Sequence, residues 1–226
     1  MKKVSVKGSI VSSNEKWIYD WFGIEAVCPK DIQKALDEAG GEPVVVEINS
    51  GGGDIFAGSE IYTALKGYDG GVEVQIVGLA ASAASVVAQA GKSKISPTAL
   101  FMVHNVSGGA RGDYRDMEHQ AEVLKTANRS IANAYMEKTG KTIEELQNIM
   151  DHETWMDARK AVEYGFVDEV MFAETPVLTN GIGVLSAETI TKMKKTIGNP
   201  QANADFLVEK TKLHLLKMKG EMRNEI

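Results

Sequence analysis

The run from residue 72 to residue 90 constrains the fold more than any other part of the chain. Residues 72–77 are rich in valine and isoleucine, which indicates a strand, and residues 82–90 are mostly small, which favours a buried helix. Ser82 therefore lies where a strand passes into a helix, and unpaired backbone N–H groups gather at such a point. Its hydroxyl is either a helix cap or a nucleophile beside N–H donors that are already in place.

Strands and helices alternate along most of the chain, which predicts an α/β fold with a largely parallel sheet. We expect strands at residues 3–11, 44–49, 72–77, 94–95, 99–103 and 166–171, and helices at residues 29–39, 55–65, 82–90, 113–138 and 158–164, with a short helix opening at the capping box of residues 142–145. Residues 12–27, which include Trp17 and Trp21, predict an irregular loop that packs on a neighbouring surface. Residues 152–156 predict a connector.

Length and composition limit the classes of protein that the chain can belong to. Its 226 residues fit one sizeable domain with an appendage, and a change in composition near Ala173 predicts a domain at 1–174 and a linker with a helical tail at 175–226. The net charge of −6 gives no reason to expect binding to nucleic acid or to a membrane. The single cysteine, Cys28, excludes an internal disulfide framework, and no apolar run reaches transmembrane length, so we expect a cytoplasmic protein. The four histidines lack metal-ligand spacing, so no metal site is expected.

Three further segments contain residues that could bind a substrate or take part in catalysis. Gly51-Gly-Gly53 follows a buried strand; it fits neither phosphate-binding glycine pattern, but it lets the backbone approach a substrate closely or form a tight turn. His104 ends the strand Leu100-Phe-Met-Val103, a position typical of catalytic residues and also of hydrogen-bonded structural histidines. Asp151-His-Glu153 is an acidic connector that supplies two candidate carboxylates.

Together with Ser82, these segments supply the parts of a Ser-His-acid triad. His104 would take the hydroxyl proton, and a carboxylate would hold the imidazole in the required tautomer. The chain order Ser, His, acid and the lack of a G-x-S-x-G elbow exclude the lipase and esterase class.

Five segments resemble, in order, the motif series of the Clp protease proteolytic subunit: Ile48-Asn-Ser-Gly-Gly-Gly53, Gly78-Leu-Ala-Ala-Ser-Ala83, Met102-Val-His104, Gly108-Gly-Ala-Arg-Gly112 and Ala161-Val-Glu-Tyr-Gly-Phe-Val-Asp168. The resemblance implies a serine endopeptidase with a crotonase-like core of stacked, parallel-rich sheets and flanking helices. It also implies a homo-oligomeric ring that encloses the active sites. No metal, nucleotide or organic cofactor is implied for this subunit, and any ATP would be used by a separate unfoldase partner.

Carried over by position, the resemblance assigns Ser82 as nucleophile and His104 as base, and it gives the oxyanion hole to the backbone N–H groups of Gly53 and Ala83. It also implies that Gly51 and Gly52 offer an edge to which an extended peptide can pair.

The loop that begins with Gly108 and Gly109 is expected to contribute to substrate binding, and with the helix that follows it matches the handle used for ring-to-ring contact.

Three departures from the family pattern separate this chain from the housekeeping members. Glu153 stands where the family usually has aspartate, with Asp151 as the competing acid, and His152 stands where arginine is common. The first expected strand begins close to Met1, where housekeeping members carry a segment that faces the ATPase, so we expect docking to differ. The pattern Ala80-Ala-Ser-Ala-Ala-Ser85, the run Glu153-Thr-Trp155 and the helical tail resemble the prophage-encoded branch associated with head maturation, in which the substrates are scaffold and capsid precursors.

Four alternatives stay open at this stage. The first is a housekeeping-type subunit working with an ATP-dependent unfoldase, and the second is a crotonase-type acyl-CoA enzyme that uses the same oxyanion amides. A Ser–Lys dyad with Lys92 or Lys94 is the third. The fourth is an inactive, ring-forming capsid or scaffold component.

Overall fold

The computed structural model describes residues 1–173 and residue 191, and Met1–Ala173 form one compact unit. The tail predicted for 175–226 lies outside the described residues, apart from the single residue Thr191. In chain order the elements are β1 (Lys2–Ile10), α1 (Lys16–Trp21), β2 (Ala26–Val27), α2 (Pro29–Ala39), β3 (Val44–Gly53), α3 (Ile55–Lys66), β4 (Val72–Ala81), α4 (Ala83–Val87), the 3-10 turn η1 (Ala88–Ala90), β5 (Lys92–Ile95), β6 (Leu100–Val103), α5 (Tyr114–Thr139), α6 (Ile143–Asp151), β7 (Thr154–Asp157), α7 (Ala158–Glu163) and β8 (Glu169–Val170).

The strands form one mostly parallel sheet, as the alternation of elements predicts. The order is β2-β1-β3-β4-β5-β8, with all neighbours parallel, while β6 pairs with the outer part of β4 and β7 pairs antiparallel with β6. Strand β4 is the branch point, since its first half pairs with β5 and its second half with β6. The strand that leads to Ser82 is therefore flanked on both sides by other strands and is firmly placed.

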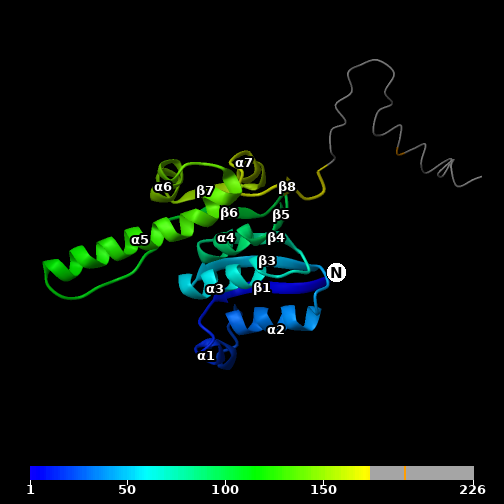
Figure 1. Ribbon diagram of the computed structural model, residues 1–226, viewed down its shortest axis with the longest axis horizontal. Helices are drawn as coiled ribbons and strands as arrows, with labels where there is room; N and C mark the ends of the chain where they lie inside the picture. Colours follow the sequence, from blue (N-terminus) through cyan, green and yellow to red (C-terminus); the bar gives the residue numbers. More distant parts are fainter. Residues whose placement is uncertain (174–190, 192–226) are drawn as a thin grey trace, which may run out of the picture. The chain divides into compact units, whose positions relative to one another are not determined.

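Helix α3 contacts both α2 and α4, and these helices cover one face of the sheet beside β1 and β3 (Figure 1). The local sequence explains their ends: Pro29 opens α2, Gly40 ends it at a φ of 59°, and the Asp54 side chain caps α3 by accepting from the Ala57 N–H at 2.8 Å. The opposite face of the sheet is more polar, with Glu47 paired to Lys3.

Helix α5 has two environments along its length. Figure 1 shows its first part extending away from the sheet, while Ala132, Ala134 and Tyr135 near its end are buried. The Tyr135 ring packs edge-on against Phe166, with ring centroids 5.4 Å apart. This packing anchors the end of α5 in the core beside α4.

Two local predictions were wrong. The segment predicted as an irregular loop contains helix α1 and the short strand β2, and its side chains Trp17 and Trp21 remain exposed within the described chain. The segment predicted as a connector contains β7, because it pairs with β6. Strands β2 and β7 are short and depend on pairing with β1 and β6, so periodicity does not reveal them. No helix among the described residues is long and apolar enough to span a membrane.

Candidate active site

Ser82 occupies a strained turn between β4 and α4. Its φ is 53° and its ψ is −126°, a conformation that costs a non-glycine residue on the order of 1–3 kcal/mol. The turn is held by a hydrogen bond from the Ser82 N–H to the carbonyl of Met102, at 3.2 Å, on the neighbouring strand β6. Although Ser82 is the N-cap residue of α4, its side chain makes no capping hydrogen bond. The hydroxyl is therefore available for another role.

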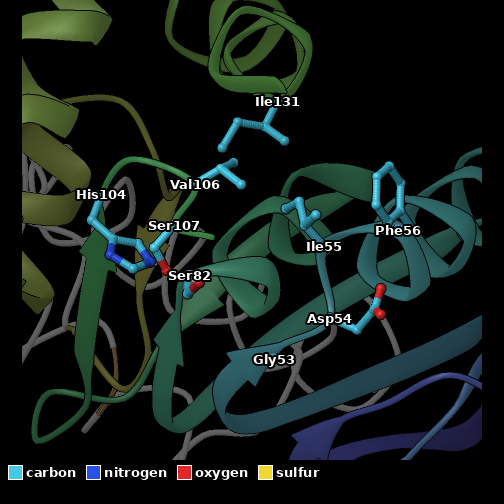
Figure 2. Close-up of a pocket in the computed structure, with 9 residues that line it drawn as sticks. All are labelled: Gly53, Asp54, Ile55, Phe56, Ser82, His104, Val106, Ser107 and Ile131. Carbon is cyan, nitrogen blue, oxygen red and sulfur yellow. Dashed lines mark hydrogen bonds between the residues drawn. The ribbon is translucent and has the colours of Figure 1, made fainter. Parts of the chain in front are cut away.

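His104 meets this hydroxyl. It follows β6, whose pairing of Met102 with Ala81 brings the two strand ends together. The His104 Nε2 atom lies 2.8 Å from the Ser82 Oγ atom, and Figure 2 shows the two side chains pointing toward one another. A neutral imidazole protonated on Nδ1 would accept the serine proton at Nε2, which is the contact that a nucleophile and its general base require.

The two candidate acids have other partners. Glu153 has a φ of 43°, and its carboxylate accepts a hydrogen bond from the indole N–H of Trp155 at 3.2 Å. Asp151 accepts from the side-chain amide of Asn105 at 2.7 Å. Within the described part of the chain, neither carboxylate is hydrogen-bonded to His104. The hydrogen bonds of the structure therefore select neither carboxylate, and the third member of the triad stays a prediction.

The glycines at the end of β3, which continue the strand where a tight turn was one of the expectations, lie directly against Ser82. A Cβ atom on Gly52 would stand 2.7 Å from the Ser82 Cβ and 2.9 Å from the Ala83 nitrogen, and Gly52 has a φ of +92°. Gly53 lines the cavity beside Ser82. Ala83 is the first residue of α4, so its N–H has no acceptor within the helix. The structure thus brings both predicted oxyanion donors to the turn that carries the candidate nucleophile.

A cavity of about 250 Å³ adjoins Ser82 and His104. Figure 2 shows the side chains around it; the apolar ones are Ile55, Phe56, Val106 and Ile131. Asp54 and Ser107 complete the lining. Sequence reasoning assigned none of these residues to a site, although Asp54 to Phe56 directly follow the glycines at the end of β3 and Val106 follows His104.

The other glycines predicted to bind substrate are placed less closely. A Cβ atom added to Gly51 would meet no atom within 4 Å, and the same holds for Gly109. A Cβ on Gly108 would lie 3.5 Å from the side chains of Gln120 and Leu124 on α5. Of the loop after β6, Val106 and Ser107 reach the cavity. Roles in substrate binding for Gly51, Gly52, Gly108 and Gly109 remain predictions.

Across residues 1–173 and residue 191, no group of three or more His, Cys, Asp or Glu side chains could hold a metal ion.

Comparison with known proteins identifies the family. Residues 32–174 match the family model described as Clp protease. The chain is 35% identical over 139 residues to the ATP-dependent Clp protease proteolytic subunit 1 of Chlamydia muridarum, covering 59% of this chain and 72% of that protein. The protein of the same name from Salinibacter ruber is 32% identical over 137 residues, covering 59% of each chain.

The fold agrees with this assignment. A solved ClpP1 mutant from Listeria monocytogenes superposes with a TM-score of 0.63 at 23% identity, covering 76% of this chain and 92% of that one. The family match spans more than half of the chain and includes the strand ends that carry Ser82 and His104. The chain belongs to the Clp protease family.

Proposed function

We propose that this protein is a serine endopeptidase that hydrolyses peptide bonds with Ser82 as nucleophile and His104 as general base. The observation that carries the proposal is the 2.8 Å contact between Ser82 Oγ and His104 Nε2 beside a cavity. The strained backbone at Ser82 supports it, because such strain is found where function requires a side chain to be presented.

The proposed reaction follows from this geometry. His104 removes the hydroxyl proton as Ser82 Oγ attacks the peptide carbonyl carbon, and the resulting oxyanion is stabilised by the N–H groups of Gly53 and Ala83. His104 then protonates the leaving amine, and an acyl-enzyme forms on Ser82. Water, activated by His104, hydrolyses that ester and regenerates the serine. Glu153 is proposed to orient His104 and to stabilise its protonated form.

The cavity supports a preference for apolar side chains next to the bond that is cut. Four of its lining side chains are apolar, and a cavity of about 250 Å³ beside Ser82 can receive a side chain of the substrate. A carboxylate side chain would lose hydration there, and Asp54, which lines the same cavity, would repel it.

The wider biological role is also a proposal. We propose a homo-oligomeric ring that encloses the active sites, in a prophage-encoded protease that processes capsid or scaffold precursors. Glu153 at the acid position and His152 before it are features by which this chain departs from the housekeeping pattern. The named relatives are ATP-dependent proteolytic subunits, so a housekeeping role with an unfoldase is the second candidate.

The test compares the wild-type protein with Ser82→Ala on fluorogenic peptides and with a fluorophosphonate probe. We expect the variant to lose peptide cleavage while keeping the wild-type unfolding midpoint. Mass spectrometry should place the probe on Ser82, which matters because Ser107 lines the same cavity. Turnover that persists in Ser82→Ala would rule out the assigned nucleophile. Absence of both turnover and labelling in an intact oligomer would favour the inactive scaffold alternative, and acyl-CoA turnover that survives Ser82→Ala would favour the crotonase-type enzyme.

A further inference from the structure

The peptide group between Ser82 and Ala83 is fixed by an unusual pair of hydrogen bonds. The Ser82 carbonyl accepts from the backbone N–H of Ser85 at 2.9 Å and from the Ser85 hydroxyl at 2.6 Å. A trans peptide is planar, and its N–H points away from its C=O. Holding the Ser82 carbonyl therefore also fixes the direction of the Ala83 N–H, one of the two proposed oxyanion donors.

The Ser85 hydroxyl is itself held by a residue from another element. Its oxygen lies 2.8 Å from the hydroxyl oxygen of Tyr135 on α5. Ser85 has a single hydroxyl proton, which it donates to the Ser82 carbonyl, so Tyr135 must donate to Ser85. Burial raises the pKa of the Tyr135 hydroxyl well above its ordinary value, which keeps it protonated and able to donate.

The hydrogen bond between Ser85 and Tyr135 lies in apolar surroundings, where packing alone does not call for a polar side chain. Ser85 is fully buried in α4, where its neighbours are alanines and valines, and an alanine would fill the same space without a polar atom to satisfy. Tyr135 is also buried, and its ring is held against Phe166. The Gln89 side chain donates to the Ser85 carbonyl at 2.7 Å, which further restrains the turn. The Ser85 hydroxyl is thus directed at the Ser82 carbonyl and is itself held by the Tyr135 hydroxyl.

We propose that Ser85 and Tyr135 are positioning residues that keep the Ala83 N–H aimed at the oxyanion. The inference rests on the proposed function and extends it: through Tyr135, the end of α5 helps to set the conformation of the turn that carries Ser82. Ile131, one helical turn before Tyr135, lines the cavity, so α5 touches both the substrate site and the link to Ser82. A shift of α5 would therefore alter the oxyanion donor and the cavity together.

The experiment uses Ser85→Ala and Tyr135→Phe in the full chain, with Ser93→Ala as the matched control. Ser93 is also fully buried, and its hydroxyl donates to Asp168 at 3.1 Å, away from the cavity. We measure kcat and KM on a fluorogenic peptide, and the affinity for a peptide aldehyde, whose adduct with Ser82 carries an oxyanion. Loss of an oxyanion donor costs about 10²–10³-fold in kcat. A misdirected donor should therefore cost about 10–100-fold in Ser85→Ala and less in Tyr135→Phe, with KM within about twofold.

Aldehyde affinity should fall in parallel with kcat in both variants, while Ser93→Ala should keep wild-type kinetics. Unchanged kcat and aldehyde affinity in Ser85→Ala, or equal losses in Ser93→Ala, would overturn the inference. A wild-type protein without Ser82-dependent turnover would instead contradict the proposed function. In that case crystal structures of the wild type and Ser85→Ala decide the inference: a rotated Ser82–Ala83 peptide in the variant supports it, and an unchanged peptide overturns it.

Discussion

Val103 on β6 and Thr154 on β7 are partners in an antiparallel ladder. Beyond this pair the two segments continue to His104 and to Glu153, and Glu153 has already left the strand conformation, with a φ of 43°. Glu153 is thus one residue from the last ladder pair beside His104, whereas Asp151 is three residues from it. For this reason we propose Glu153, rather than Asp151, as the third member of the triad.

Glu153→Gln should lower kcat by roughly 10²–10⁴-fold, because an amide cannot hold the productive tautomer of His104 or stabilise its charge. The comparison is Asp151→Asn, which removes the carboxylate that accepts from Asn105. Steady-state kinetics on one peptide, with circular dichroism to check folding, gives the answer. A larger loss in Asp151→Asn than in Glu153→Gln would transfer the role to Asp151.

Gly52→Ala should damage both stability and activity. The new Cβ would stand 2.7 Å from the Ala81 carbonyl oxygen and from the Ser82 Cβ, at a φ of +92° that disfavours alanine. We expect a loss of roughly 1–3 kcal/mol in the free energy of unfolding and a fall in kcat. Gly51→Ala is the control for stability, because a Cβ there meets no atom within 4 Å. Equal urea midpoints for the two variants would contradict the expected clash.

The cavity beside Ser82, with its four apolar side chains, should set substrate preference. Peptides with leucine before the cut should be cleaved at least about tenfold faster than the same peptides with aspartate, since burying a charge there costs free energy. Ile131→Lys should reduce this ratio by placing in the cavity wall an ammonium group that can pair with the aspartate side chain of the substrate. Ser59→Lys adds the same charge on the exposed side of α3, outside the cavity, and should keep the wild-type ratio. Equal ratios of kcat/KM values in Ile131→Lys and wild type would contradict this prediction.

Asp168 should make folding stability depend on pH. Burial by itself raises the pKa of Asp168, but hydrogen bonds from Lys138 and from the Ser93 backbone N–H outweigh it, and the net pKa is lowered. A carboxylate with a depressed pKa stabilises the fold above its unfolded pKa, about 3.9, and this stabilisation is lost as the pH falls through the lower, folded value. Asp168→Asn should therefore be less stable than wild type near neutral pH, by roughly 1 kcal/mol after allowance for solvent screening of this partly exposed carboxylate.

Below about pH 4 the difference in the free energy of unfolding between wild type and Asp168→Asn should shrink. The reason is that the Asp168 carboxylate of wild type is then neutralised by protonation, and the asparagine of the variant is neutral at every pH. Urea unfolding between pH 7 and pH 3 measures this difference directly. Glu122→Gln is the comparison. Glu122 is an exposed carboxylate paired with Lys125, so this substitution should change the stability, and its dependence on pH, by less. A stability difference between wild type and Asp168→Asn that stays constant across this pH range would show that ionisation of Asp168 does not make folding stability depend on pH.

The sequence was sufficient for the features that depend on local pattern. The alternation of strand-like and helix-like segments, with apolar strand patterns at 44–49 and 72–77, predicted the parallel sheet, which the structure and the related fold confirm. Ser82 and His104 could be singled out because each stands at the end of a strand. Strand ends are visible as changes in hydrophobic periodicity, so positions of this kind can be read without a structure.

Only the tertiary structure decided how distant segments meet. The pairing of β6 with β7 brings the segment that carries Glu153 beside the strand that leads to His104, and the packing of α5 brings Ile131 to the cavity and Tyr135 to Ser85. In the sequence, Tyr135 and Ile131 are apolar positions on a long helix, and Ser85 is a small residue in a small-residue helix. Their contacts depend on register and helix packing between residues far apart in the chain, and a local pattern carries no information about either.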